Sequence, residues 1–476
     1  MPTAAANAQA PSLTAVEQLG KEIYFDDISH PGGMSCASCH TPTAGWASPD
    51  DEVNAHGSVI PAGTTPARFG NRKPPSAAYA TFAPQLHYDA ARGSFVGGNF
   101  FDGRATGAKL GNPAADQALG PFLNPVEMNN PDKANVLAQI AASPYAAAWA
   151  AAWGEPLEYD TPAKIEQNYD RIGLSIAAYE GSSEVNRFTS KYDYYLQGQV
   201  NLTALEADGL RTFEGKGKCA DCHTSQPGPN DEPPLFTDFS YANLGVPKNE
   251  ENPFYDMDEV LVDGQPVNPA GDAWVDPGLG GFLASQTDEP TWTAMADDNM
   301  GKHKTPTLRN VALSFEDGFT RAYMHNGVFK TLEEVVSFYN TRDTATWPAP
   351  EVADNLETAT VGNLGLNAYQ EEAIVAFMKT LTDGYDLFNL PGDFSNDGVV
   401  DSYDLDDPLL GWNARLGLDL AGSDFLLWQQ QATAASAANV SEPASFGLGA
   451  AVTLALVAWR SRRGRSARRP VPELAS

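Results

Sequence analysis

Two copies of one cysteine–histidine pattern are the residues in this chain best suited to do chemistry. Two thiols at this spacing can form thioethers to the two vinyl groups of one haem, and the imidazole of the next residue can reach its iron. The pattern therefore predicts two covalently attached c-type haems. The two copies, which use all four cysteines, are Cys36-Ala-Ser-Cys39-His40 and Cys219-Ala-Asp-Cys222-His223.

Two other readings of the pattern fit less well. A thioredoxin-like redox pair is typical of a βαβ context, which the flanking sequence does not indicate. A zinc knuckle needs four ligands grouped together, whereas the two copies lie far apart in the chain. We therefore favour haem, with His40 and His223 as the iron ligands.

The composition indicates a soluble-type globular protein with an acidic surface. Hydrophobic residues make up 42% of the 476 residues, enough to build cores, and the length suits two or three domains. The 30 Lys and Arg residues against 61 Asp and Glu give a formal net charge of −31. This charge disfavours binding to nucleic acid and would attract a basic electron-transfer partner. The alternative is that the acidic surface only keeps the protein soluble.

An internal repeat precedes each haem pattern. Residues Leu13–Gly20 (LTAVEQLG) match Leu202–Gly209 (LTALEADG). In both copies a Thr-x-x-Glu sequence predicts a capping box that opens a helix, and apolar residues follow at helical spacing. Each haem pattern is thus expected to follow its own amphipathic helix.

A second pair of helices is expected to close the two domains. Residues 169–179 and 368–381 each place apolar side chains on one helical stripe. The intervening Gly- and Pro-rich stretches 61–84 and 227–290 show too little periodicity for regular elements and are expected to be loops around the cofactors. The fold class predicted is mainly α, with two tandem cytochrome c-type domains that each carry one covalent haem, at residues 11–200 and 201–390, followed by a small C-terminal calcium-loop module.

The C-terminal module is predicted from one acidic loop. Its oxygen-bearing side chains, with a glycine at the sixth position, have the spacing of a calcium loop, although a solvated acidic turn would look similar. The loop resembles a dockerin repeat, and residues 419–428 resemble the end of a degenerate second one, so we assign 391–435 to a dockerin-like module. The candidate calcium ligands are Asp393, Ser395, Asp397, Val399, Asp401 and Asp404.

Both ends of the chain indicate export. Residues 1–10 are small and resemble the end of a removed export signal. In residues 440–469 an uncharged run of 14 residues, 446–459, precedes several arginines, and the whole resembles a PEP-CTERM sorting signal, with Ser441 where proline is usual. A tail anchor is the alternative. We expect a protein of the periplasm or cell surface of a Gram-negative-type bacterium, anchored by the tail before processing.

Five ordered segments carry a family resemblance. They are Phe101–Ala105, Gln117–Met128, Thr305–Leu313, Tyr323–Gly327 and Thr331–Val336. Together they resemble the bacterial dihaem cytochrome c peroxidases, and the resemblance runs from about residue 11 to residue 385.

The resemblance implies unequal roles for the two haems. It places the peroxide-reactive haem on His40 with Glu127 as the distal acid/base, and an electron-relay haem on His223. A carboxylate can carry a proton from the peroxide oxygen nearer the iron to the one farther from it, and an aliphatic side chain cannot. Tyr339 stands at the position where the peroxidases usually have a methionine that binds the relay iron, and MauG-type enzymes have a tyrosine there. Met324 is a rival candidate for this iron ligand.

The sequence departs from the family pattern at several positions. Phe101 occupies the inter-haem position where the family has tryptophan. For the calcium that relatives bind between the domains, Thr320 matches, but Tyr79 and Ala322 replace Asn and Pro, so that ion is doubtful. His56 lies near a mobile iron ligand of some relatives.

The sequence thus predicts a dihaem oxidoreductase that reduces hydrogen peroxide at the N-terminal haem. Electrons would arrive through the C-terminal haem from a small cytochrome c or cupredoxin, and a homodimer is compatible with the family. One alternative is a MauG-like enzyme that uses peroxide to oxidise a partner protein or small substrate. Another is a non-catalytic electron-transfer cytochrome displayed at the surface.

Overall fold

The computed structural model divides the chain into two units that are described separately. The first ends at Asp386 and the second begins at Leu387. The residues that the structure describes are 12–55, 60–228, 231–313 and 319–385, with short pieces between 394 and 428.

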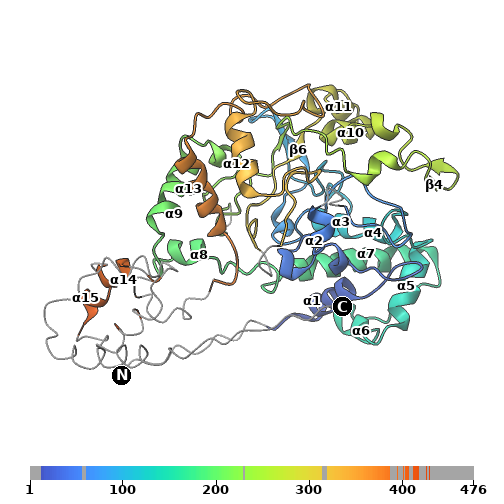
Figure 1. Cartoon of the computed structure of the whole chain (residues 1–476). Helices are drawn as coiled ribbons and strands as arrows, with labels where there is room; N and C mark the ends of the chain where they lie inside the picture. Colours follow the sequence, from blue (N-terminus) through green and yellow to red (C-terminus); the bar gives the residue numbers. More distant parts are fainter. Residues whose placement is uncertain are drawn as a thin grey trace, which may run out of the picture. The chain divides into compact units, whose positions relative to one another are not determined.

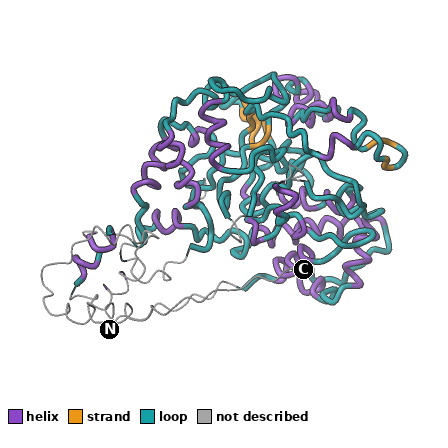
Figure 2. The backbone as a smooth tube through the Cα atoms, in the orientation of Figure 1, coloured by secondary structure: helices purple, strands orange, loops and turns teal. Residues whose placement is uncertain are grey.

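Short helices joined by long loops build the first unit (Figures 1 and 2). In its N-terminal half the helices are α1 (Ala15–Phe25), α2 (Asp51–Ala55), α3 (Pro113–Ala118), α4 (Gly120–Leu123), α5 (Lys133–Ala142), α6 (Ala148–Trp153), α7 (Pro162–Glu180) and α8 (Lys191–Leu196). In its C-terminal half they are α9 (Ala204–Glu214), α10 (Gly278–Ser285), α11 (Pro290–Thr293), α12 (Leu332–Thr341) and α13 (Ala368–Lys379).

The strands of the described residues form small antiparallel pairs. They are β1 (His87–Asp89) with β2 (Ser94–Val96), β3 (Tyr241–Ala242) with β6 (His303–Lys304), and β4 (Leu261–Val262) with β5 (Gln265–Pro266). The mainly α prediction is confirmed for this unit.

The first core lies where α1 crosses α7. The predicted capping box is present, with Thr14 and Glu17 bonding to each other's backbone N–H groups. Gly20 allows the crossing, because a Cβ there would overlap the carbonyl oxygen of Ser175 in α7. Leu19 of α1 and Ile172 of α7 are completely buried in this core, and each such side chain contributes about 1.5–3 kcal/mol by leaving water.

The second core repeats this arrangement with α9 and α13, which lie side by side in Figure 1. Thr203 and Glu206 form the second capping box. Gly209 lies where a Cβ would overlap the carbonyl oxygen of Ala373, just as Gly20 does in the first core. Phe213 and Phe377 pack edge to face with ring centroids 5.2 Å apart. The sequence repeat is therefore a structural repeat.

The loop prediction for residues 227–290 is wrong in part. This stretch contains α10, whose Leu279 and Leu283 are fully buried against Phe95 of the N-terminal half. Glycines obscure the helical pattern here, because Gly280 and Gly281 occupy positions that a helix prediction would fill with larger residues.

Buried polar contacts join the two halves of the first unit. Arg309 donates two hydrogen bonds to the carboxylate of Asp193, at 2.8 and 3.0 Å, and its side chain has no exposed area. The Tyr79 hydroxyl donates to Asp383 at 2.7 Å. Because Tyr79 is engaged in this way, its hydroxyl is not free for an interdomain calcium, and that ion stays a prediction.

The described residues of the second unit include α14 (Tyr403–Asp406) and α15 (Trp412–Arg415). A small core there includes Phe394, Leu405 and Trp412. Asp404, the last candidate calcium ligand, is buried. The other candidates, Asp393, Ser395, Asp397, Val399 and Asp401, lie outside the described residues.

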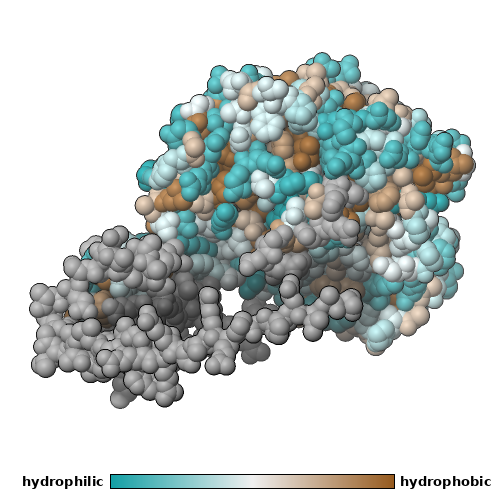
Figure 3. All heavy atoms as spheres, viewed as in Figure 1, coloured by the Kyte–Doolittle hydropathy of each residue, from teal (hydrophilic) through white to brown (hydrophobic). Residues whose placement is uncertain are grey.

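Other predictions also fall outside the described residues: the signal remnant 1–10, His56 and the tail 440–469. Among the residues that the structure does describe, no helix has the length and apolar character needed to span a membrane. On the face drawn in Figure 3, hydrophilic residues predominate, and hydrophobic ones gather at the tip where Figure 1 labels β4; Leu261 of that strand is exposed.

Candidate haem sites and their surroundings

The N-terminal haem pattern lies at the end of a short loop after α1. A 3-10 helix, Cys36–Ser38, carries the first thiol. The Tyr24 hydroxyl of α1 donates to the carbonyl oxygen of His40 at 2.7 Å, and His40 Nδ1 lies 3.4 Å from the carbonyl oxygen of Trp46. Burial lowers the pKa of His40 to about 4, so its imidazole is neutral, as an iron ligand must be.

The C-terminal pattern has the same local structure. Cys219 begins a 3-10 helix that follows α9, and His223 Nδ1 lies 2.9 Å from the carbonyl oxygen of Phe236. Burial lowers the pKa of His223 as well. Contact of Nδ1 with a backbone carbonyl fixes the ring and leaves Nε2 for a metal.

The residues around both patterns fit covalently held haem. A cavity lined by Cys36, Cys39 and His40 has apolar walls, and a second cavity is lined by Cys219, Cys222 and His223. None of the four cysteines forms a disulfide. Two thiols and an imidazole facing an apolar cavity are what thioether attachment and iron ligation require.

Glu127 lies in the same cavity as Cys36 and Cys39, on the segment that follows α4. Burial raises the pKa of Glu127, and the guanidinium of Arg104 opposes this effect. Arg104 is held in place by Asp102, whose carboxylate accepts its hydrogen bond at 2.9 Å, and by the ring of Phe100. This environment favours the protonated form of the Glu127 carboxyl more than water does.

Tyr339, on α12, lines the cavity that contains His223. Its hydroxyl has no hydrogen-bond partner among the described residues, and burial raises the pKa of Tyr339. A half-buried phenol that lines a cofactor cavity is suited to bind iron. Met324 lines the same cavity but also packs beside Phe329 and Phe338.

Phe101 lines both cavities and is 8% exposed. Its ring centroid lies 6.5 Å from that of His325. The inter-haem position predicted for Phe101 therefore borders both predicted haem sites, and the ring there has no N–H to donate.

Sequence reasoning missed three buried ionisable residues in these cavities. Glu180, at the end of α7, is 4% exposed, and burial raises its pKa to about 8. Burial lowers the pKa of Lys73 and of Lys304 to about 7. The sequence does indicate burial for Glu180, because this residue lies four positions after Ile176 on the apolar stripe of α7. Lys73 lies in a loop and Lys304 in the two-residue strand β6, where no periodicity marks burial.

Comparisons with known proteins agree with this geometry. The family model described as di-haem cytochrome c peroxidase matches residues 14–201. The methylamine utilization protein MauG of Paracoccus denitrificans is 33% identical over 399 residues, which cover 80% of this chain and 92% of that protein. Cytochrome-c peroxidase IdrP2 of Denitromonas iodatirespirans is 28% identical over 79% of this chain and 83% of its own length.

Among solved structures, the dihaem peroxidase BthA of Burkholderia thailandensis is similar, with a TM-score of 0.61 and 30% identity over 79% of this chain and 88% of that chain. The chain belongs to the dihaem cytochrome c peroxidase and MauG family. It is therefore a peroxide-dependent oxidoreductase with two c-type haems.

Proposed function

We propose that the protein reduces hydrogen peroxide in the N-terminal cavity, with electrons arriving through the C-terminal one. The observation that carries this proposal is the position of Glu127, a half-buried carboxyl in the cavity lined by Cys36, Cys39 and His40. The C-terminal cavity is lined by Tyr339 of α12, and Glu127 lines only the N-terminal one, so the two sites are suited to different steps.

Glu127 acts as the acid and base of this reaction. The carboxylate accepts the proton of the peroxide oxygen that is retained and delivers that proton to the other oxygen, which leaves as water when the O–O bond breaks. Overall, hydrogen peroxide, two electrons and two protons give two molecules of water. Haem, when bound, supplies the iron chemistry that exchanges electrons with the substrate. The Arg104 guanidinium favours the ionised form of Glu127, which is the form that accepts the proton.

A second function, oxidation of a partner protein or small substrate in the manner of MauG, is favoured by Tyr339. A phenolate stabilises oxidised iron, whereas a methionine thioether stabilises reduced iron. With Tyr339 as ligand, the C-terminal site would accept electrons poorly from a high-potential donor and would be better suited to withdraw them from a substrate.

Glu127→Gln tests the first proposal. We expect the rate of peroxide consumption to fall by roughly 10²–10⁴-fold, the usual contribution of a general acid–base group, with both haems still attached. The wild type should lose activity as pH falls through the raised pKa of Glu127, because the protonated carboxyl cannot accept a proton, and the variant should lack this acid limb. An unchanged rate would refute the role of Glu127.

Two measurements separate the candidate functions. Rapid oxidation of a reduced small cytochrome c or cupredoxin by peroxide supports the peroxidase, whereas its absence, with oxidation of another substrate, supports the MauG-like enzyme. An electron paramagnetic resonance spectrum of the resting protein with two low-spin signals that persist after partial reduction would favour an electron-transfer cytochrome instead.

Tyr339→Met tests the ligand itself. Replacing phenolate by thioether should raise the reduction potential of the C-terminal haem, because the new ligand favours reduced iron. Met324→Leu serves as the matched control and should leave that potential unchanged. If Tyr339→Met has no effect and Met324→Leu lowers the potential, Met324 is the ligand.

The cellular setting completes the proposal. We infer that the protein is exported, because covalent haem attachment occurs outside the cytoplasm, and that the tail 440–469 anchors it before processing. Cleavage in that tail is directly measurable by mass spectrometry of protein isolated from its host.

A further inference from the structure

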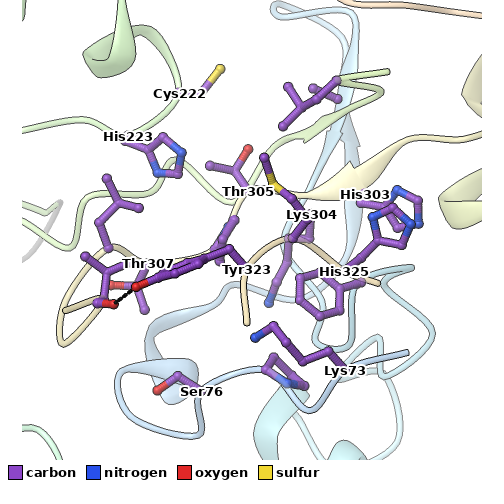
Figure 4. A pocket seen from close by; sticks show the side chains of 18 of the residues that line it. Lys73, Ser76, Cys222, His223, His303, Lys304, Thr305, Thr307, Tyr323 and His325 are labelled. Carbon is purple, nitrogen blue, oxygen red and sulfur yellow. Dashed lines mark hydrogen bonds between the residues drawn. The ribbon is translucent and has the colours of Figure 1, made fainter. Parts of the chain in front are cut away.

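Four ionisable side chains gather beside the inter-haem position, apart from the haem ligands and Glu127. Figure 4 shows the rings of His303 and His325 side by side, on the opposite side of the view from His223 and Cys222. Asp276 and Glu351 complete the group, which we name the histidine–carboxylate cluster. His325, Asp276 and Glu351 have side chains that are at most 6% exposed, and that of His303 is 13% exposed.

The donor atoms of the cluster are spaced as metal ligands are. Asp276 Oδ2 lies 3.2 Å from His303 Nε2 and 3.9 Å from His325 Nε2. His325 Nε2 lies 3.6 Å from Glu351 Oε2. Donors around one tetrahedral ion with bonds of about 2.0–2.2 Å lie roughly 3.4 Å from one another, and Glu351 lies outside the group that the other three residues form. The ligand atoms of Asp276, His303 and His325 all lie within 4.8 Å of one another.

The Nε2 atoms of the two imidazoles have no hydrogen-bond partner among the described residues. Both Nε2 atoms are buried and make no hydrogen bond, since their short distances to the carboxylates lack hydrogen-bond geometry. A buried nitrogen without a partner costs about 1–3 kcal/mol.

The charges of the cluster also leave room for a cation. Arg72 donates hydrogen bonds to both oxygens of Asp276, at 2.6 Å each, and is shared with Asp102. Glu351 accepts from the Tyr255 hydroxyl at 3.0 Å, but among the described residues no lysine or arginine pairs with it. A buried carboxylate without a cation is costly, and an ion at the cluster would supply the missing charge.

We propose that the histidine–carboxylate cluster binds a divalent first-row transition ion of the zinc type. Imidazole nitrogens select such ions over Ca²⁺ and Mg²⁺, which prefer oxygen ligands alone. Arg72 acts as the outer partner that orients the Asp276 carboxylate. The proposal is independent of the proposed function, since none of the four side chains is a haem ligand or the acid–base group.

The rings of His303 and His325 are nearly parallel, at 10° with centroids 3.6 Å apart. An ion must lie near the plane of each ring, so one ring turns about its Cβ–Cγ bond on binding. His303, the more exposed of the two, is the one that turns.

Zinc serves as the probe on the haem-loaded, tag-free protein. The protein is stripped with a chelator, dialysed against Zn²⁺ with excess Ca²⁺ to occupy oxygen-only sites, and analysed for metals. We expect one zinc for every two haem irons. His303→Phe, which keeps an aromatic ring but has no donor, should retain none, whereas the control His87→Phe, at an exposed position of β1, should retain one.

A diffraction experiment at the zinc absorption edge then locates the ion. The expected anomalous peak lies between Asp276 and His325. No retained zinc in the wild type, one zinc retained by His303→Phe, or a peak elsewhere would each overturn the proposal. The haem iron content shows whether His303→Phe folds; should it fail to, Glu351→Gln replaces it, and zinc affinity there must fall by at least about tenfold.

Discussion

Glu180 offers the sharpest test of how these cavities are built, because a carboxyl is buried there without a counter-charge. It is 4% exposed, and its side chain has no hydrogen-bond or ion-pair partner among the described residues. Burial raises its pKa from 4.5 to about 8. The folded protein therefore keeps the Glu180 proton up to about pH 8, whereas the unfolded chain releases it above about pH 4.5.

The sign and size of the effect follow from this difference. Where the folded state holds one proton more than the unfolded state, stability falls as pH rises. The contribution of the Glu180 proton to the free energy of unfolding is complete below about pH 4.5 and is lost as pH rises to the pKa of Glu180 in the folded protein. Between about pH 5 and pH 8 the group alone removes about 3.5 kcal/mol of unfolding free energy, at 1.36 kcal/mol per pH unit. Glu180→Gln cannot ionise and should remove this part of the pH dependence.

Guanidinium unfolding of the haem-loaded protein at several pH values between these limits measures the effect. We expect Glu180→Gln to gain stability relative to the wild type steadily as pH rises, by about 3.5 kcal/mol over the range. Glu372→Gln, at an exposed position on α13, is the control and should follow the wild type. If the Glu180→Gln and wild-type curves stay parallel, Glu180 is ionised in the folded protein and the reasoning fails.

Two further changes test the framework of the first unit. Gly20→Ala should lower the free energy of unfolding, measured by thermal melts, by about 1–3 kcal/mol or more, because the added Cβ overlaps a carbonyl oxygen of the crossing helix. Gly209→Ala should have an equal effect for the same reason. The control Gly70→Ala should have little effect, because the nearest atom to the added Cβ is 3.8 Å away. Arg309→Met should cost about 3–5 kcal/mol, since it leaves the buried Asp193 carboxylate unpaired. The double variant with Asp193→Asn should recover part of this loss, and no recovery would show that packing alone is responsible.

Much of the helical framework was accessible from the sequence because local chemistry determines it. The capping boxes at Thr14 and Thr203 need only residues three positions apart, and the apolar stripes of α7 and α13 need only helical periodicity. The haem patterns are equally local. Gly20 and Gly209 belong to the same repeat, yet their role became visible only when the crossing helices were in place.

The residues that could not be predicted are brought together by loops. Asp276, His303 and Glu351 lie on three separate segments, and nothing in their neighbours marks them as a group. Their proximity depends on where long loops return, which no periodicity encodes. The helix α10 was missed for a different reason, because its glycines lower helix propensity while its leucines gain stability from burial.

The two halves are alike in their helices and unlike at their cavities, and this contrast bears on function. In each half a capped helix crosses a closing helix at a glycine and is followed by the haem pattern, so the framework gives both sites the same attachment. The cavity residues differ: Glu127 comes from the segment after α4, and Tyr339 from α12. A site that must move protons needs a carboxyl such as Glu127, and a site that must hold oxidising equivalents is served by a phenol such as Tyr339. In the proposed function, the division of labour between the two haems therefore resides in residues outside the repeat, and substitutions there should change the reaction without changing haem attachment.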